Sequence, residues 1–262
     1  GSSTILETIQ SVADQTYKNW IINIYDNNSS DKSIKLISTK YTKLISEGKI
    51  KIHLNDGFIT QAQNWNRCLN EIKSFEYFKL LCADDILEPN HLEVGIKALS
   101  KTKNDVAAFS SSINYIDEES NIFGFRSYGF FKIEFWLSLF YRNYLGCPSA
   151  MIIKTNTYKG YTFSEIPYVG DLIFFMEFYL DDKIFIFTKK PSASFRVTST
   201  SDTGRSYGTR EMILGRREFR KLIIKTMKVK GLCKLFLFAF NLLITAAEKF
   251  YFTARKTLKS LK

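Results

Sequence analysis

The sequence predicts an α/β fold in which a mostly parallel, mixed sheet is flanked by helices. Short apolar stretches rich in β-branched and aromatic residues alternate with segments whose apolar residues recur at helical spacing. The chain has 262 residues and is 45% hydrophobic, which is enough for one full core. Polar turns with carboxylates follow several predicted strands, and open α/β sheets bind ligands at that edge.

The first third of the chain alternates helices and strands. Ile5, Ile9 and Val12 lie at helical spacing and predict a helix over residues 4–16. Trp20 to Tyr25 reads WIINIY, a short strand of β-branched and aromatic residues. By the same criteria, helices are expected at residues 32–45 and 61–72, and strands at residues 49–54 and 77–82.

The later segments continue this alternation less regularly. Polar residues with Gly204 and Gly208 among them predict a mobile loop or linker at residues 198–209. Helices are expected at residues 91–99 and 171–180, strands at 106–110, 151–154 and 184–188, an irregular or hairpin-like segment at 114–125, and an aromatic-rich segment at 131–141.

The positive charge is confined to the C-terminal quarter. The net charge is +11, and residues 205–262 carry 15 Lys and Arg against three acidic residues, which leaves the remainder near neutral. We therefore expect an α/β domain at residues 1–204 and a basic amphipathic helical tail at residues 205–262. A neutral body argues against a nucleic-acid-binding surface there, and few aromatic residues suited to base stacking lie in residues 205–230.

The tail has the composition of a helix that lies on an anionic membrane. Leu235 to Ala247 (LFLFAFNLLITAA) is an apolar run of 13 residues, which is shorter than the roughly 20 residues that a membrane span needs. Lys and Arg flank this run and favour docking in the plane of an anionic bilayer. The alternative is a helix packed on the domain with a solvated basic face.

Asp84 and Asp85 form the most informative pair in the chain. They follow an apolar segment (FEYFKLLCA) and precede Pro89, so they are expected in a polar turn at the carboxyl edge of the sheet. Carboxylate oxygens there can hold a divalent cation and a diphosphate. The alternative is that one of them caps the following helix. Four scattered cysteines and two isolated histidines indicate neither a zinc site nor a disulfide framework.

An ordered set of motifs resembles a family 2 glycosyltransferase with the GT-A fold, a Rossmann-like nucleotide-sugar-binding domain. The resemblance covers roughly residues 4–200. It is carried by SVADQTYKNW (Ser11 to Trp20), YDNNSSD (Tyr25 to Asp31), NDGFITQAQNWNRCL (Asn55 to Leu69), LLCADDILEP (Leu80 to Pro89), LGCPSA (Leu145 to Ala150) and YVGDLIFFMEF (Tyr168 to Phe178).

The resemblance implies a donor site built around the first two polar turns. Asp26 and Asn27 would contact the nucleoside, with a helix cap as the alternative for this turn. Asn64 and Arg67 would lie on the donor side, and a solvated Arg67 is the alternative.

The acidic pair corresponds in this resemblance to the family's D-x-D element. Asp85 would ligate Mn²⁺ or Mg²⁺ directly, and Asp84 would contact ribose or sugar hydroxyls.

The same resemblance places the catalytic base at Asp171. In an inverting transfer this carboxylate takes the proton from the acceptor hydroxyl, and a helix N-cap is the alternative role. Tyr168, Gly170 and Ser149 would lie on the acceptor side. Gly170 stands where relatives carry Glu, and Glu165 could supply the missing carboxylate.

Two further departures from the family pattern concern the metal shell and the start of the chain. Thr198 stands where many relatives carry a His that completes the metal shell. A strand that usually precedes the first helix is also not in the printed sequence, so either residues are omitted or part of the base pocket is missing.

We therefore expect an inverting, non-processive enzyme that moves a sugar from a nucleotide-sugar, with uridine as the expected base, to a hydroxyl of a glycan or polyprenyl-linked acceptor. Such acceptors occur in O-antigen, lipopolysaccharide or capsule synthesis, and the expected location is cytoplasmic, peripheral at the inner face of the cell membrane. The alternative is a catalytically silent sugar-nucleotide or glycan-binding partner in a membrane-associated assembly.

Overall fold

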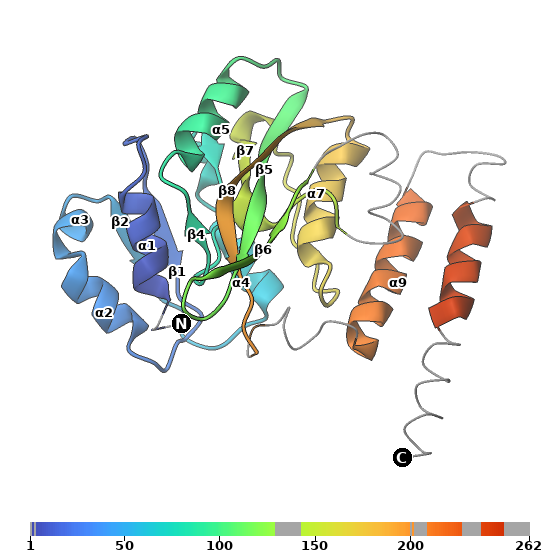
Figure 1. Cartoon of the computed structure of the whole chain (residues 1–262), viewed down its shortest axis with the longest axis horizontal. Coiled ribbons are helices and arrows are strands. Elements are labelled where there is room, and N and C mark those ends of the chain that lie inside the picture. The colour runs from blue at the N-terminus through green and yellow to red at the C-terminus, as the bar shows by residue number, and fades with distance from the viewer. Residues whose placement is uncertain are drawn as a thin grey trace.

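The structure is a computed structural model, and it describes residues 2, 4–128, 143–199, 201, 209–226 and 237–248. The predicted aromatic-rich segment at residues 131–141 and most of the predicted loop at residues 198–209 lie outside the described residues. Within the described ranges, the structure confirms an α/β architecture with a mixed sheet flanked by helices (Figure 1).

The N-terminal unit is a parallel pair of strands covered by helices. β1 (Ile22–Tyr25) pairs with β2 (Ile50–His53) in parallel. α1 (Ile5–Ala13), α2 (Ser33–Lys40) and α3 (Thr42–Ser46) accompany them. The apolar spacing that predicted α1 buries Ile5 and Ile9 against Ile37, Tyr41 and Ile50.

The helix predicted at residues 32–45 is broken into α2 and α3 at Tyr41. The Tyr41 hydroxyl donates to the Leu6 carbonyl of α1 at 2.9 Å, and its ring is buried in the same cluster. This tertiary contact fixes Tyr41 at the junction, which local spacing alone does not predict.

The second sheet has the strand order β3-β7-β5-β8-β4, with β6 paired to β5. β5 and β8 run parallel at its centre, and the other described pairs of this sheet are antiparallel. The strands are β3 (Tyr77–Phe78), β4 (Ile86–Leu87), β5 (Val106–Ile116), β6 (Ile122–Arg126), β7 (Met151–Lys154) and β8 (Ile184–Arg196).

Several elements differ in length from their predictions. The helix expected at residues 61–72 is α4 (Gln61–Cys68), followed by a 3₁₀ turn at Ile72–Ser74. The strand expected at residues 77–82 ends at Phe78. Beyond it, the Lys79 amine donates to the Ser149 carbonyl at 2.5 Å and the Cys82 N–H donates to the Ser149 hydroxyl at 3.1 Å, so side-chain contacts replace ladder bonds.

The remaining helices pack around this sheet. They are α5 (His91–Ser100), α7 (Gly170–Leu180) and α9 (Arg210–Thr226), and two 3₁₀ turns, Pro148–Ala150 and Thr155–Thr157, flank β7. The α7 sequence GDLIFFMEFYL is apolar on nearly all sides, and six of its side chains are buried. A helix that is apolar all round belongs in a core.

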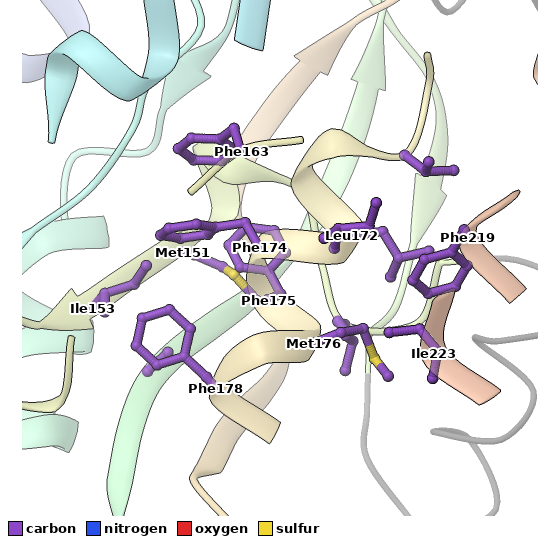
Figure 2. Close-up of a cluster of buried hydrophobic side chains, with 14 of the residues drawn as sticks. Met151, Ile153, Phe163, Leu172, Phe174, Phe175, Met176, Phe178, Phe219 and Ile223 are labelled. Atoms are coloured by element: carbon purple, nitrogen blue, oxygen red, sulfur yellow. The ribbon is translucent and has the colours of Figure 1, made fainter. Parts of the chain in front are cut away.

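α9 belongs to the same hydrophobic core as α7. Phe219 and Ile223 of α9 pack in one cluster with Leu172 and Met176 of α7 (Figure 2). The start of the predicted tail is therefore packed against the α/β domain. The predicted domain boundary at residue 204 lies outside the described residues.

Residues 237–248 form a further helix beside α9 (Figure 1). Arg220 of α9 is 1% exposed, and its guanidinium donates to the Asn241 side-chain oxygen at 2.9 Å and to the Glu248 carboxylate at 2.8 and 3.0 Å. A buried guanidinium needs such partners, so these bonds fix the two helices in register. Among the described residues, no helix is both long enough and apolar enough to cross a bilayer.

Candidate functional site

The first strand delivers Asp26 to the carboxyl edge of the β1–β2 pair. Parallel strands place their carboxyl ends together, and the Asp26 N–H donates to the His53 carbonyl at 2.9 Å. The half-buried Asp26 carboxylate accepts from the Ser29 N–H at 3.0 Å. Lys32 occupies the cap position of α2, so Asp26 does not cap that helix. Its carboxylate shapes a turn at the edge where a nucleoside was predicted.

Asn27 fastens this turn to the loop before α4. Its side-chain nitrogen donates to the Ile59 carbonyl at 2.8 Å, and its side-chain oxygen accepts from the Ile59 N–H at 3.1 Å. The next residue, Asn28, has φ of 60°, a left-handed conformation that asparagine tolerates better than most residues. The described contacts of Asn27 are therefore structural, and a contact with the donor stays a prediction.

Asn64 and Arg67 lie on one face of α4 and meet the end of β1. The Asn64 side chain donates to the Tyr25 carbonyl at 3.2 Å and accepts from the Arg67 guanidinium at 2.9 Å. That guanidinium also donates to the Leu54 carbonyl at 3.2 Å and lies over the Tyr25 ring, 5.6 Å from its centroid. Arg67 is thus held in the cluster with Asp26, and the alternative of a solvated helix residue does not fit its contacts.

The turn at Asp84 and Asp85 has two different carboxylates. Asp85 is 1% exposed and accepts a hydrogen bond from the Ser149 hydroxyl and one from the Arg196 N–H, the latter at 3.0 Å. Asp84 is half-buried. Asn90 is the cap residue of α5, so neither carboxylate serves as the helix cap that was the alternative.

Burial sets the protonation behaviour of Asp85. Desolvation, followed by the charge of Asp84, raises the pKa of Asp85 to about 7, although the Ser149 and Arg196 donors act in the opposite direction. A metal ligand needs lone pairs that face the bound ion, and both Asp85 oxygens face protein donors. Each Asp85 oxygen accepts one protein hydrogen bond, and a direct metal contact by Asp85 stays a prediction.

Arg196 fastens the acidic turn from the end of β8. Its side chain is 1% exposed and donates to the Asp84 carbonyl at 2.9 Å and to the Asp117 carbonyl at 2.7 Å. It also donates to the Glu7 carboxylate of α1 at 2.6 Å and the Ser120 hydroxyl at 3.0 Å. One guanidinium thus ties the turn to β8, to the β5–β6 hairpin and to α1.

Ser149 lies under the acidic turn and away from solvent. It is buried, and its hydroxyl donates to Asp85 while it accepts from the Cys82 N–H. The Lys79 amine donates to the Ser149 carbonyl, and burial lowers the pKa of Lys79 to about 8. The Ser149 side chain is therefore used inside the fold, and its acceptor-side role stays a prediction.

A divalent cation at this turn has few protein ligands to draw on. The described residues contain no group of three or more His, Cys, Asp and Glu side chains that could hold one. Mg²⁺ and Mn²⁺ in phosphate sites commonly use one or two carboxylates and complete their shell with substrate phosphates and water. The half-buried Asp84 carboxylate fits that donor set. Thr198, at the position of the family histidine, has its hydroxyl oxygen bonded to the Ser201 N–H at 2.9 Å.

Asp171 lies in the first turn of α7. The cap position belongs to Val169, which excludes the N-cap alternative for Asp171. Burial raises the pKa of Asp171 to about 6, and the Leu172 N–H, donating at 2.8 Å, and the Arg216 guanidinium of α9 oppose that shift. A carboxylate with this pKa is ionised near neutral pH and is a better proton acceptor than an ordinary aspartate.

The buried Cys147 thiol connects the two acidic positions. Burial raises its pKa to about 12, and the negative charges of Asp85 and Asp171 both contribute to the shift. The Cys147 thiol thus responds to the charge of both carboxylates, one in the acidic turn and one at the start of α7.

The segment before Asp171 is tightly constrained. A Cβ at Gly170 would lie 2.6 Å from the Ser164 carbonyl oxygen, so the larger Glu of the family pattern does not fit this backbone. Tyr168 is exposed and has φ of 63°, a conformation that costs energy for an aromatic residue. Glu165, suggested as a substitute carboxylate, accepts from the Gln63 side chain of α4 at 2.8 Å.

Sequence reasoning missed three of the charged residues that shape this site. The sequence patterns do not single out Arg196, whereas Lys79 lies in a predicted strand and Arg216 in the predicted basic tail. Lys79 could have been singled out, since a lysine inside an apolar strand needs a partner. Nothing in the local sequence of Arg196 or Arg216 reveals contacts with residues more than 40 positions away.

Comparison with known proteins identifies the family. The model described as glycosyl transferase family 2 matches residues 2–163, more than half of the chain. A search of curated protein sequences gave no match.

Solved structures share the fold at low sequence identity. A TarS fragment (1–349) from S. aureus, solved with UDP, aligns with a TM-score of 0.60 and 15% identity over 92% of this chain and 68% of its own. The mannosyltransferase PcManGT from Pyrobaculum calidifontis, solved with GDP-Man and Mn²⁺, aligns with a TM-score of 0.64 and 12% identity over 97% of this chain and 72% of its own. GalNAc-T7, solved with UDP, GalNAc and Mn²⁺, aligns with a TM-score of 0.55 and 14% identity over 77% of this chain and 44% of its own. The fold and the family match agree, and the chain belongs to glycosyl transferase family 2.

Proposed function

We propose that this glycosyltransferase moves one sugar from a nucleotide-sugar to an acceptor hydroxyl with inversion at the anomeric carbon. The observation that carries the proposal is the Asp171 carboxylate in the first turn of α7, which accepts from the Leu172 N–H at 2.8 Å and whose pKa is raised by burial to about 6. The chain thus offers a proton acceptor in addition to an acidic turn where a diphosphate could bind.

In the proposed reaction, Asp171 takes the proton of the acceptor hydroxyl as that oxygen attacks the anomeric carbon. The bond between the anomeric carbon and the diphosphate oxygen breaks, and its electron pair leaves with the nucleoside diphosphate. Attack from the side opposite the leaving group inverts the configuration. Tyr168 and Gly170, beside the base, are proposed to line the acceptor side.

We assign the metal contact to Asp84 and a positioning role to Asp85. This differs from the sequence-based prediction, in which Asp85 ligates the metal and Asp84 contacts ribose or sugar hydroxyls. The support is that Asp85 is 1% exposed with a protein donor on each oxygen, whereas Asp84 is half-buried. When bound, Mn²⁺ or Mg²⁺ would neutralise charge on the departing diphosphate. Asp85 and Arg196 would hold the backbone of the turn that carries Asp84.

We propose a uridine-linked donor held at the edge of the β1–β2 pair. Asp26 would contact the nucleoside, and Asn64 and Arg67 would fix the turn that carries it. Two of the structural neighbours were solved with UDP and one with GDP-Man, so both nucleotides belong in a test.

We further propose that the acceptor is a glycan or a polyprenyl-linked sugar at the inner face of the cell membrane, as in O-antigen or capsule synthesis. The support is the net charge of residues 205–262, where 15 basic residues stand against three acidic ones, because basic segments are attracted to anionic lipid. The proposed boundary at residue 204 marks only the position after which this basic region begins.

A donor screen tests the reaction. Purified protein is incubated with UDP- and GDP-sugars and Mn²⁺ or Mg²⁺, and release of the nucleoside diphosphate is measured. We expect slow hydrolysis of one donor without acceptor, and faster turnover with a hydroxyl acceptor. Binding of the donor with no cleavage under any condition would instead support the catalytically silent alternative, which the glycine at position 170 and the threonine at position 198 favour.

A further inference from the structure

The outer face of helix 237–248 is apolar and uncovered in the described structure. Phe238 is 54% exposed, Leu242 54% and Leu243 67%. At helical spacing these residues share one side of the helix with Ala239, Ala246 and Ala247, which are exposed as well. Large contiguous apolar surfaces of this kind mark interaction sites.

The opposite face of the same helix is fixed on the protein. Leu237 is buried in the core cluster that contains α7, and Asn241 is buried and bonded to Arg220. Glu248, which is the one charged residue in 237–248, pairs with the same arginine. The inner face therefore holds the helix in a set rotation, and the outer face is left without a single charge.

The chain on both sides of this helix is strongly cationic. Residues 227–236 and 249–262 contain eight Lys and Arg and no acidic residue. The sequence thus joins an uncharged apolar helix face to basic residues at both of its ends. This combination complements an anionic lipid surface, where the apolar face enters the boundary between headgroups and acyl chains and the cations meet the lipid headgroups.

The helix is also connected to the candidate catalytic loop. It is bonded to α9 through Arg220, and a Cβ at Gly215 of α9 would lie 2.2 Å from the Pro167 carbonyl oxygen. Through α9, helix 237–248 is therefore connected to the segment before Asp171.

We propose that the outer face of helix 237–248, centred on Phe238, Leu242 and Leu243, lies on an anionic bilayer and holds the site beside membrane-linked acceptors. This deepens the membrane association proposed above and rests on it. The proposed docking surface is one face of helix 237–248 and not the whole basic tail, because α9 packs against the core.

Vesicle sedimentation tests the assignment with the full chain. The triple variant F238S/L242S/L243S is compared with wild type on phosphatidylcholine vesicles with and without phosphatidylglycerol. A matched control, I122S/F123S/F125S, removes an equal number of exposed apolar side chains from β6. We expect the first variant to lose at least about tenfold in partitioning onto anionic vesicles, while the control binds as wild type does.

Measurements in solution separate the possible failures. Circular dichroism, light scattering and donor hydrolysis without lipid are recorded for each protein. Equal vesicle binding by F238S/L242S/L243S and wild type would overturn the proposal. So would a wild-type dimer that the variant converts to a monomer with unchanged vesicle binding, since the face would then join two copies. Vesicle binding that depends on this face in a protein that cleaves no donor would support the docking surface and refute the proposed enzymatic function.

Discussion

Replacing Arg196 with Met should destabilise the fold and disorder the acidic turn. The guanidinium is 1% exposed and donates to three backbone carbonyls, those of Asp84, Asp117 and Glu118, as well as to Glu7 and Ser120. Methionine fills most of the volume but leaves these acceptors without a donor. Removing one partner of such a buried network costs about 3–5 kcal/mol. Since each kcal/mol lowers the Tm of a chain of this size by about 2–4 °C, we expect a fall on the order of 10 °C.

Glu7→Gln provides the matched control. It removes the charged partner and leaves the backbone contacts of Arg196 in place. The Glu7 side chain is 44% exposed, so this ion pair is screened by solvent and contributes at most about 1 kcal/mol.

Thermal unfolding followed by circular dichroism measures both variants, and binding of UDP with Mn²⁺ reports on the turn. Arg196→Met with a Tm within about 2 °C of wild type would refute the argument that this guanidinium holds the site together. Equal effects of the two variants would show that the ion pair, and not the backbone network, carries the stability.

Three further predictions concern the base, α9 and the metal contact. Because burial raises the pKa of Asp171 to about 6 and only the ionised form accepts a proton, kcat should fall about tenfold per pH unit below that value; a flat profile down to pH about 4, the ordinary range of aspartate, would contradict this. Gly215→Ala should cost about 1–3 kcal/mol in chemical unfolding, since its Cβ meets the Pro167 carbonyl, whereas Gly57→Ala, with nothing within 4 Å, should be neutral. Asp84→Asn should remove the Mn²⁺ dependence of UDP binding measured by calorimetry; an unchanged metal response would exclude Asp84 as the ligand.

The order of strands and helices could be predicted from local patterns, but several boundaries could not. Ile5, Ile9 and Val12 define α1 because apolar spacing directly reports the buried face. Tyr41 interrupts a helix through a bond to Leu6, and that bond depends on the packing of two helices. β5 and β8 extend beyond their apolar runs because they pair with each other in parallel over most of their length.

The candidate site was found by motif order, but the division of roles within it required the structure. Two adjacent aspartates are equivalent in sequence, and only burial distinguishes Asp85 from Asp84. Ser149 likewise belongs to a recognisable motif, although its hydroxyl donates a hydrogen bond to Asp85 inside the fold. Asp171 lies beyond the residues matched by the family model, so its proposed role depends on its place at the start of α7 and on its pKa.

The composition of the tail predicts a membrane-docking surface but does not identify the residues that form it. Charge counting placed the basic region after residue 204, yet α9 buries Phe219 and Ile223 in the main core. The uncovered apolar face belongs to the next helix, because Arg220 fixes which side of that helix turns inward. Helical periodicity within the run LFLFAFNLLITAA could not choose that side, since nearly every residue in it is apolar.

The most direct test of the proposed mechanism compares UDP binding and sugar transfer in wild type and Asp171→Asn. Thermal shift with UDP and Mn²⁺ reports donor binding, and release of UDP in the presence of an acceptor reports turnover. We predict that Asp171→Asn binds UDP as wild type does and loses about 10²- to 10⁴-fold in kcat, the usual contribution of a general base. Wild-type turnover in this variant would contradict the assignment of Asp171 as the base.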